Sequence, residues 1–277
     1  MERSALMIVC NGEPYVGLQL KHIYNIVDEI VIAEGPQDGH FAKLIKSKRS
    51  NDGTIQTIKK FPDPDKKITL IHTNCDKNKM VAKANRLCHG KYIYQIDVDE
   101  FLSESMINAG FEGLAKGRCD NIRVPERWYY KWHDTFLSSG RPGHIRALPN
   151  RFYTNKIDIG SVICHIPWCG YFDKKGKYYA AKSQPLSQKE FIGHHFLAVY
   201  RSHLVRKMRY YAAARQAVTT AIADKKIKEF DAVTRNRIGK RIESYNGLLI
   251  RTKAKKFNIK AIDDNMEKLK KWGKKIR

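Results

Sequence analysis

A ten-residue stretch, Tyr92 to Phe101, constrains the fold of this chain more than any other. It begins as an apolar run of Ile, Val and Tyr residues and closes on three carboxylates, Asp97, Asp99 and Glu100. A β-branched and aromatic run of this kind is typical of a strand in a sheet interior. Acids clustered at its end repel one another unless a cation or hydrogen-bond donors compensate them. The stretch predicts a buried strand that ends either in a cation site or in a solvated acidic turn.

Strand-like and helix-like patterns alternate before this stretch. Strands are predicted over 6–10, 28–35 and 68–72, and helices over 15–26, 55–61 and 77–89, with Gly90 as the last C-cap. Alternation at this spacing predicts parallel βαβ units. We therefore expect an α/β, Rossmann-like fold with a mostly parallel sheet flanked by helices. Such sheets bind ligands at the carboxyl ends of their strands, where hard oxygen ligands suit Mg²⁺ or Mn²⁺ holding a diphosphate.

The order of the motifs resembles that of the GT-A glycosyltransferases, and within them the family-2-like group. The motifs that carry the resemblance are Asn11-Gly12-Glu13, Val27-Asp28-Glu29-Ile30-Val31 with the acid Glu34, Ser50-Asn51-Asp52-Gly53-Thr54, Ala84-Asn85 and Asp97-Val98-Asp99-Glu100. The resemblance is good over residues 5–103 and thinner over 104–210. The chain departs from the group at 36–49, an extra segment before the Ser-Asn-Asp-Gly-Thr element.

The resemblance implies a GT-A fold and a nucleotide-sugar donor, with a UDP-sugar expected. It also implies which positions contact that donor. Asp52 is expected to organise its loop and cap the following helix. The expected donor-binding residues are Asn11, Glu13, Glu34, Lys83, Asn85 and Asp97.

The resemblance further implies a divalent cation, Mn²⁺ or Mg²⁺. Asp99 is expected as a direct ligand, with Asp97 beside it and Glu100 in support. GT-A sites often add a His from far downstream, and here His194 and His195 both qualify, without a basis for choosing between them. Imidazole is a normal ligand for Mn²⁺.

The catalytic base is less well defined. Transfer with inversion needs a carboxylate or His within reach of the acceptor hydroxyl. Relatives carry a His-Glu pair where this chain has His165 followed by Ile166, so the expected Glu is missing. His165, Asp173 and Glu126 stay as candidates, and the stereochemical outcome stays open.

Length and composition predict a domain over 1–200 and a basic helical extension over 201–277. The first is divided into a nucleotide-sugar half, 1–103, and an acceptor half, 104–200. A hydrophobic content of 42% supports a core, and no apolar run approaches membrane-spanning length. Six cysteines without paired spacing are typical of reduced thiols, which favours a cytoplasmic protein, in the host cytoplasm if it is viral.

Charge is the second strong feature of the sequence. The chain has 52 Lys and Arg against 28 Asp and Glu, a net charge of +24, and 23 basic residues stand against seven acidic ones in 201–277. That segment predicts helices over 204–224, 228–253 and 262–274. An excess of this size indicates a polyanionic partner, although a solvated helical face is the plainer explanation.

Three polyanions compete for this role, and nucleic acid is favoured because the charge is spread over several helices. In that case the acceptor is a modified base, as in phage-type DNA glycosylation, and it has to leave the stack. Anionic membrane with a lipid-linked acceptor, with Trp272 adhering, and an acidic polysaccharide are the alternatives. A non-catalytic nucleic-acid-binding protein on a GT-A scaffold is a further one. The residues expected on the acceptor side are Arg141, Arg146 and Arg151, with Trp128, Tyr129, Tyr130 and Trp132 as stacking platforms.

Overall fold

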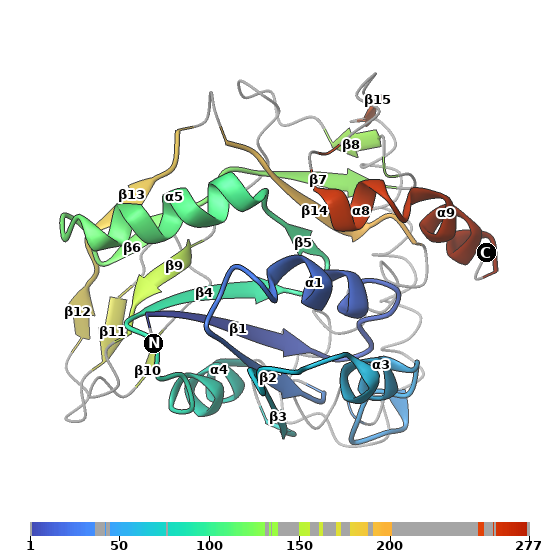
Figure 1. The fold of residues 1–277 in the computed structure, drawn as a ribbon, viewed down its shortest axis with the longest axis horizontal. Coiled ribbons are helices and arrows are strands. Elements are labelled where there is room, and N and C mark those ends of the chain that lie inside the picture. Colours follow the sequence, from blue (N-terminus) through green and yellow to red (C-terminus); the bar gives the residue numbers. More distant parts are fainter. Residues whose placement is uncertain are drawn as a thin grey trace, which may run out of the picture.

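The structure is a computed structural model that describes residues 2–36, 42, 45–75, 77–130, 133, 135–137, 150–155, 161–162, 170–172, 178–187, 191–200, 249–251, 257 and 259–275. In Figure 1 these residues form a central sheet with helices on both faces and a smaller sheet above it. Within this part of the chain, no helix combines the length and the apolar character needed to cross a bilayer.

The central sheet has seven strands in the order β13-β6-β9-β4-β1-β2-β3. Its neighbours β4, β1, β2 and β3 run parallel, and β9 runs antiparallel to β4 and β6. The apolar runs of β1, β2 and β4 are buried on both faces, as the sequence predicts, whereas the residues of the edge strand β3 are partly buried or exposed. The predicted α/β class with a mostly parallel sheet is confirmed. The strands are β1 Arg3–Val9, β2 Glu29–Glu34, β3 Ile68–His72, β4 Tyr92–Asp97, β6 Asn121–Arg123, β9 Asn150–Thr154 and β13 Ser183–Pro185.

A second sheet has the order β15-β8-β7-β14-β5, and β10, β11 and β12 form a third. The second sheet matters for function because β5 directly follows the acids at the end of β4. Its strands are β5 Glu100–Phe101, β7 Glu126–Tyr130, β8 Thr135–Leu137, β14 Gly193–Ala198 and β15 Leu249–Arg251, and the third sheet has β10 Ser161–Val162, β11 Gly170–Phe172 and β12 Tyr178–Ala180.

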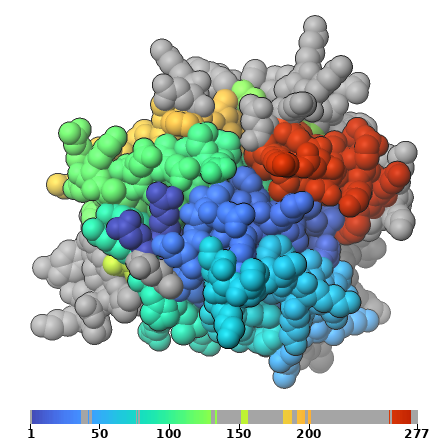
Figure 2. Space-filling model, in the orientation of Figure 1, coloured from blue at the N-terminus to red at the C-terminus, as the bar shows by residue number. Residues whose placement is uncertain are grey.

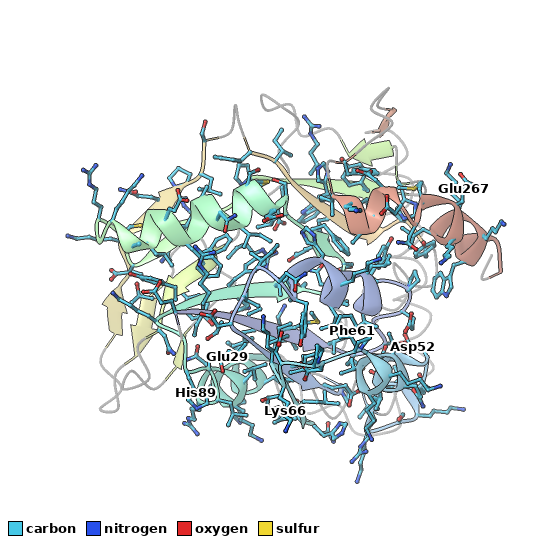
Figure 3. All side chains as sticks on the ribbon, viewed as in Figure 1. Glu29, Asp52, Phe61, Lys66, His89 and Glu267 are labelled. Carbon is cyan, nitrogen blue, oxygen red and sulfur yellow. The ribbon has the colours of Figure 1, made fainter. Side chains whose placement is uncertain are left out.

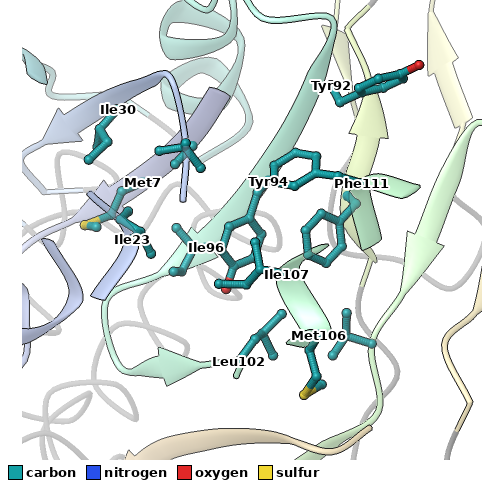
Figure 4. Packing of buried hydrophobic residues seen from close by; sticks show 14 of the residues in the cluster. Met7, Ile23, Ile30, Tyr92, Tyr94, Ile96, Leu102, Met106, Ile107 and Phe111 are labelled. Carbon is teal, nitrogen blue, oxygen red and sulfur yellow. The ribbon is translucent and has the colours of Figure 1, made fainter. Parts of the chain in front are cut away.

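Helices cover both faces of the central sheet. Helix α5 shows why: Ser103 caps its N-terminus by accepting from the Met106 N–H, and its buried residues recur at helical spacing to fill the core. Figure 4 shows Ile107 and Phe111 of this helix beside Tyr94 of β4. Helix α4 covers the opposite face. The helices are α1 Val16–Ile23, α3 Thr54–Lys60, α4 Lys77–Asn85, α5 Glu104–Ala115, α8 Lys260–Asp263 and α9 Met266–Lys275.

The predicted helix over 77–89 is too long at its C-terminus. Helix α4 ends at Asn85, and Gly90 does not cap it. Gly90 instead lies against β1, where an added Cβ would meet the Ser4 backbone N at 2.8 Å. Glycine occurs both where two backbones approach closely and at helix C-caps. The sequence alone does not distinguish these two roles, which explains the error.

The C-terminal segment differs from the sequence prediction in two places. The helix predicted over 228–253 is wrong at its end, because Leu249–Arg251 forms β15 and pairs antiparallel with β8. Pairing with a neighbouring strand outweighs helical periodicity for these three residues. The helix predicted over 262–274 is two helices, α8 and α9, interrupted at Asp264 and Asn265. The remainder of 201–248 lies outside the described residues.

An aromatic cluster joins this C-terminal segment to the rest of the molecule, and its rings are those of Tyr15, Phe101, Tyr129, Phe196, Tyr200 and Phe257. Tyr15, at the start of α1, stacks on Phe196 of β14 with ring centroids 5.7 Å apart. The Tyr200 hydroxyl donates to the Leu269 carbonyl of α9 at 2.9 Å. Figure 2 shows the C-terminal helices in red, packed directly on the blue N-terminal region. Residues 257–275 therefore belong to the packed molecule, and the predicted domain boundary at residue 200 stays a prediction.

Candidate functional site

The acids of the fourth strand lie at the carboxyl edge of the central sheet. Asp97 is the last residue of β4, and its Oδ2 lies 3.6 Å from Nζ of Lys77, the first residue of α4. Asp99 follows after Val98 and is buried, with 6% of its surface exposed. A carboxylate this buried requires a compensating group nearby.

The pairing of β5 with β14 supplies that group. His195 lies opposite Glu100 in this antiparallel pair. Its Nε2 is 3.5 Å from Oδ1 of Asp99, and Trp128 packs edge-on against its ring. The structure therefore brings His195, and not His194, next to the predicted aspartate, and metal binding by His195 stays a prediction.

His194 points to the other face of β14, as alternation along a strand requires. Its Nδ1 lies 2.8 Å from the Tyr129 hydroxyl, and its ring packs against Phe257. Burial, together with the positive charge of Arg127, lowers the pKa of His194 to about 3, so that its ring is neutral. His194 is thus a packed residue of the aromatic cluster.

A buried ion network lies directly behind His195. Arg151 of β9 donates from Nε to Oε1 of Glu126 at 2.9 Å and also pairs with Oε1 of Glu100. Burial raises the pKa of Glu100, against the opposing effect of Arg151. Burial also acts to raise the pKa of Glu126, but Arg151 and His195 outweigh it and leave this pKa lowered. The prediction that Arg151 adds to a basic acceptor surface is wrong, because the residue is 4% exposed and neutralised by these two carboxylates.

Two groups of these side chains offer ligand atoms for a divalent cation, and one group is better suited than the other. Asp99 Oδ1 and His195 Nε2 lie 3.5 Å apart, and this pair of a carboxylate and an imidazole suits Mn²⁺. Glu100, Glu126 and His195 also offer ligand atoms within 4.8 Å of one another. Arg151, however, already binds both of those glutamates.

Asn11 and Glu13 join the loop after β1 to the Ser50–Thr54 element. Asn11 has a left-handed backbone with φ of 57°, and its Oδ1 accepts from the Asn51 N–H at 2.8 Å. The Glu13 N–H donates to Asp52 Oδ2 at 3.1 Å. Asp52 Oδ1 in turn accepts from the Thr54 N–H at the start of α3, so Asp52 organises the loop as predicted. Two of the motifs that carry the resemblance, Asn11-Gly12-Glu13 and Ser50–Thr54, thus form one hydrogen-bonded structure after β1.

Glu34, the last residue of β2, is fully buried and not a solvated acid. Its Oε1 accepts from the Ser50 N–H at 2.6 Å, and its Oε2 lies 2.8 Å from Nδ1 of His72. The register of β1, β2 and β3 places Val9, Glu34 and His72 side by side. Glu34 therefore stiffens the same edge at which Asn11 lies.

Asn85 and Lys83 lie away from the acids. Because α4 connects two parallel strands, it runs back across the sheet, and its N-terminal residue Lys77 is the one that lies 3.6 Å from Asp97. The Asn85 Oδ1 accepts from the Tyr153 hydroxyl, and Tyr153 pairs with Ile93. Ile93 precedes Asp97 by four residues, or roughly 13 Å along the strand. The sequence analysis did not predict Lys77 as a site residue. The order of strand, helix and strand would have placed it at the carboxyl edge of the sheet, beside the acids.

Two of the predicted base candidates, His165 and Asp173, lie outside the described residues. The third, Glu126, is 1% exposed and engaged by Arg151. This geometry suits a supporting role better than proton abstraction.

No family model matches the chain, and no curated protein matches it either. Among solved structures it is similar to S. aureus TarS 1-349 in complex with UDP, at 15% identity and a TM-score of 0.44, over 86% of this chain and 71% of that one. It is also similar to the mannosyltransferase PcManGT from Pyrobaculum calidifontis in complex with GDP-Man and Mn²⁺, at 12% identity and a TM-score of 0.45, over 89% and 73%. It covers 43% of a longer TarS structure. With TM-scores below 0.5, these likenesses say nothing about the activity of this chain.

Proposed function

We propose that this chain is a metal-dependent glycosyltransferase that moves a sugar from a nucleotide-sugar, with a UDP-sugar as the expected donor, to an acceptor hydroxyl. One observation carries the proposal: Asp99 and His195, distant in sequence, meet at the carboxyl edge of a mostly parallel sheet. Open α/β sheets bind ligands at this edge. The motif order that resembles family-2-like GT-A enzymes supports the same reaction.

In this proposal Asp99 and His195 hold the divalent cation, Mn²⁺ or Mg²⁺, with Asp97 beside them. Such a cation, when bound, stabilises negative charge on a diphosphate leaving group. Lys77 lies 3.6 Å from Asp97 and adds a positive charge at the N-terminal end of α4, where a helix favours anions. Glu100 orders the turn by accepting from the Asp97 N–H at 3.2 Å.

The loop joined by Asn11, Glu13 and Asp52 is proposed to receive the nucleoside of the donor. Its support comes from the hydrogen bonds that fix the loop beside Glu34, at the same sheet edge as the acids. Asn85 and Lys83 are not part of this proposed pocket, since they lie at the far end of α4.

The base that accepts the proton of the acceptor hydroxyl is proposed to be His165 or Asp173. Glu126 is assigned to the support of His195 instead, because its Oε1 accepts from Arg151. The anomeric outcome follows from whichever group is the base and stays open.

For the acceptor, we propose a polyanion, with nucleic acid favoured over an anionic membrane. The lysines Lys268, Lys270 and Lys271 of α9 are exposed. The apolar side of the same helix faces inward: Leu269 is 2% exposed, and Trp272 lies edge-on to Tyr200 at 4.6 Å. Trp272 is therefore engaged in the protein and is poorly suited to the membrane adhesion that the sequence suggested. Charge without an apolar anchor fits phosphate recognition.

The experiment that tests the reaction is a screen of sugar-nucleotides by thermal shift, with and without Mn²⁺, followed by an assay of nucleotide release. A donor that binds only the folded form raises the melting temperature by mass action. We expect a UDP-sugar to do so only with the metal. No response to any UDP-, GDP- or TDP-sugar, together with tight DNA binding, would favour a non-catalytic nucleic-acid-binding protein.

A further inference from the structure

Arg151 connects the two main sheets beneath the candidate site. It lies on β9 of the central sheet, whereas its partners Glu100 and Glu126 lie on β5 and β7 of the second sheet. The three side chains are 5%, 4% and 2% exposed. One guanidinium thus fixes how these two carboxylates face each other.

The chemistry of the side chain makes this contact directional. Arg151 uses Nε for Glu126 and a terminal nitrogen for Glu100. A guanidinium presents its donors in a rigid planar fork, whereas an ammonium is a point charge. The orientation of both carboxylates therefore depends on Arg151 and not only on a positive charge at this place.

His195 lies between this network and Asp99. Its Nδ1 is 3.3 Å from Oε1 of Glu100 and 3.7 Å from Oε2 of Glu126, and its Nε2 faces Asp99. A neutral imidazole carries its proton on one nitrogen only. A proton directed to the two glutamates from Nδ1 leaves the lone pair on Nε2, the nitrogen on the Asp99 side.

The glutamates do not suit a cation of their own. Glu100, Glu126 and His195 have ligand atoms within 4.8 Å of one another, but a divalent ion among them would lie against the buried guanidinium. Like charges at such range in a protein interior repel strongly. The guanidinium of Arg151 therefore supplies the positive charge that a metal ion would otherwise supply to Glu100 and Glu126.

We propose that Arg151 is a positioning residue: through Glu100 and Glu126 it fixes the tautomer of His195, so that Nε2 is the nitrogen presented to a divalent cation beside Asp99. The cation rests on the proposed function. The tautomer is a property of the metal-free protein and can be measured without it.

The first measurement is the tautomer itself, from nitrogen chemical shifts of the histidine rings in metal-free, ¹⁵N-histidine-labelled protein, with His195→Gln used for assignment. At a pH high enough that the His195 ring is neutral, we expect Nδ1 protonated and Nε2 bare in the wild type. Arg151→Met and Glu126→Gln should each give a mixture of tautomers, and Arg151→Lys a smaller change than Arg151→Met. The control is Arg3→Met. Arg3 is a partly buried arginine on β1 that donates a hydrogen bond to Asn108.

The second measurement is Mn²⁺ affinity by calorimetry for the same variants. Loss of a group that orients a ligating histidine typically weakens metal binding by about tenfold or more, so we expect that loss in Arg151→Met and Glu126→Gln but not in Arg3→Met. If Arg151→Met does not fold, Glu126→Gln decides, because it leaves Arg151 paired with Glu100. An unchanged tautomer and unchanged affinity in a folded variant, or a bare Nδ1 in the wild type, would overturn the proposal. A wild type that binds no Mn²⁺ would refute the proposed function. The tautomer measurement would then be the test of the positioning role of Arg151.

Discussion

Nε2 of His195 lies 3.5 Å from Oδ1 of Asp99, and the antiparallel pairing of β5 with β14 is what brings them together. The pairing begins one residue after Asp99, so the strand that contains the histidine is fixed directly to the end of the acidic turn. The Phe196 N–H also donates to the Asp99 carbonyl at 2.8 Å. The distance between these two side chains is therefore set by backbone hydrogen bonds and not by flexible loops.

Asp99→Asn should abolish metal-dependent turnover and leave the fold intact. The amide keeps the size of the side chain but removes the charge that holds the cation, and loss of such an electrostatic contribution costs about 10²–10³ in rate. Nucleotide release and Mn²⁺ calorimetry check this, with circular dichroism for the fold. Asp65→Asn is the control, because Asp65 is exposed and lies beside Lys67. Normal turnover in Asp99→Asn would remove the assignment.

The two adjacent histidines should respond in opposite ways to replacement by leucine. His195→Leu should lose Mn²⁺ affinity. His194→Leu should keep that affinity but remove the hydrogen bond between His194 and the Tyr129 hydroxyl, at a cost of about 0.5–1.5 kcal/mol in the free energy of unfolding. Calorimetry with Mn²⁺ and urea denaturation separate the two effects. Equal loss of Mn²⁺ affinity in both variants would contradict the selection of His195.

Glu29 should make the protein sensitive to acid. Burial acts to raise its pKa, but hydrogen bonds from Ser4, His89 and Gly90 outweigh burial, so its folded pKa lies below the ordinary value of 4.5. Figure 3 shows Glu29 and His89 side by side. A lowered folded pKa means that the carboxylate stabilises the protein above about pH 4.5, and that this stability disappears as the pH falls below it.

The Glu29→Gln variant tests this sign. It should be less stable than the wild type at pH 7, and the difference should shrink between pH 4.5 and pH 3 in urea denaturation. Glu112→Gln, at an exposed position on α5, serves as the control and should show little difference at either pH. If the difference in the free energy of unfolding between Glu29→Gln and the wild type stayed constant with pH, the hydrogen bonds of Glu29 would not depend on the ionised carboxylate.

Gly110→Ala should destabilise the contact between α5 and the central sheet. An added Cβ would meet the ring of Phe152 at 2.5 Å, and this ring is held by stacking on Tyr94. Overpacking costs about 1–3 kcal/mol, which exceeds the gain of up to about 1 kcal/mol from the better helix propensity of Ala. Gly113→Ala is the matched control, since its Cβ would meet only the flexible end of Ile122 at 3.0 Å. Thermal unfolding of both variants gives the comparison.

Charge reversal of Lys268, Lys270 and Lys271 to Glu should weaken DNA binding and flatten its salt dependence. Each phosphate contact contributes about 0.9 to the slope of log affinity against log salt on duplex DNA. Fluorescence anisotropy over a salt series measures it, with reversal of Lys116 and Arg118 as a control at the far end of α5. Unchanged DNA binding with weakened binding to anionic vesicles would favour a membrane partner. No change in either would leave α9 as a solvated face.

Much of the first half of the fold follows from patterns in the sequence. The buried runs of β1, β2 and β4 carry their own apolar signal, and the acids at the end of β4 mark the sheet edge where the site lies. Local signals were weaker where pairing with a distant strand decides the conformation, as at β15, whose three residues are extended because they pair with β8.

The supporting half of the site was harder to predict. Arg151 appeared to be one more surface cation, because nothing in its neighbourhood in the sequence indicates two buried carboxylates on other strands. The choice between His194 and His195 depends on which face of β14 each residue occupies, and that depends on register. Lys77 was within reach of the sequence, since a helix between parallel strands begins at the carboxyl edge of the sheet.

The contact between Tyr15, Tyr200 and Leu269 has a consequence for biosynthesis. Leu269 follows Tyr15 by 254 residues in the sequence, so the helix that contacts the aromatic cluster is synthesised long after the first of its rings. N-terminal segments usually fold first during synthesis. Here the ring cluster around Phe196 is complete only once α9 has been synthesised, so this part of the molecule finishes folding late.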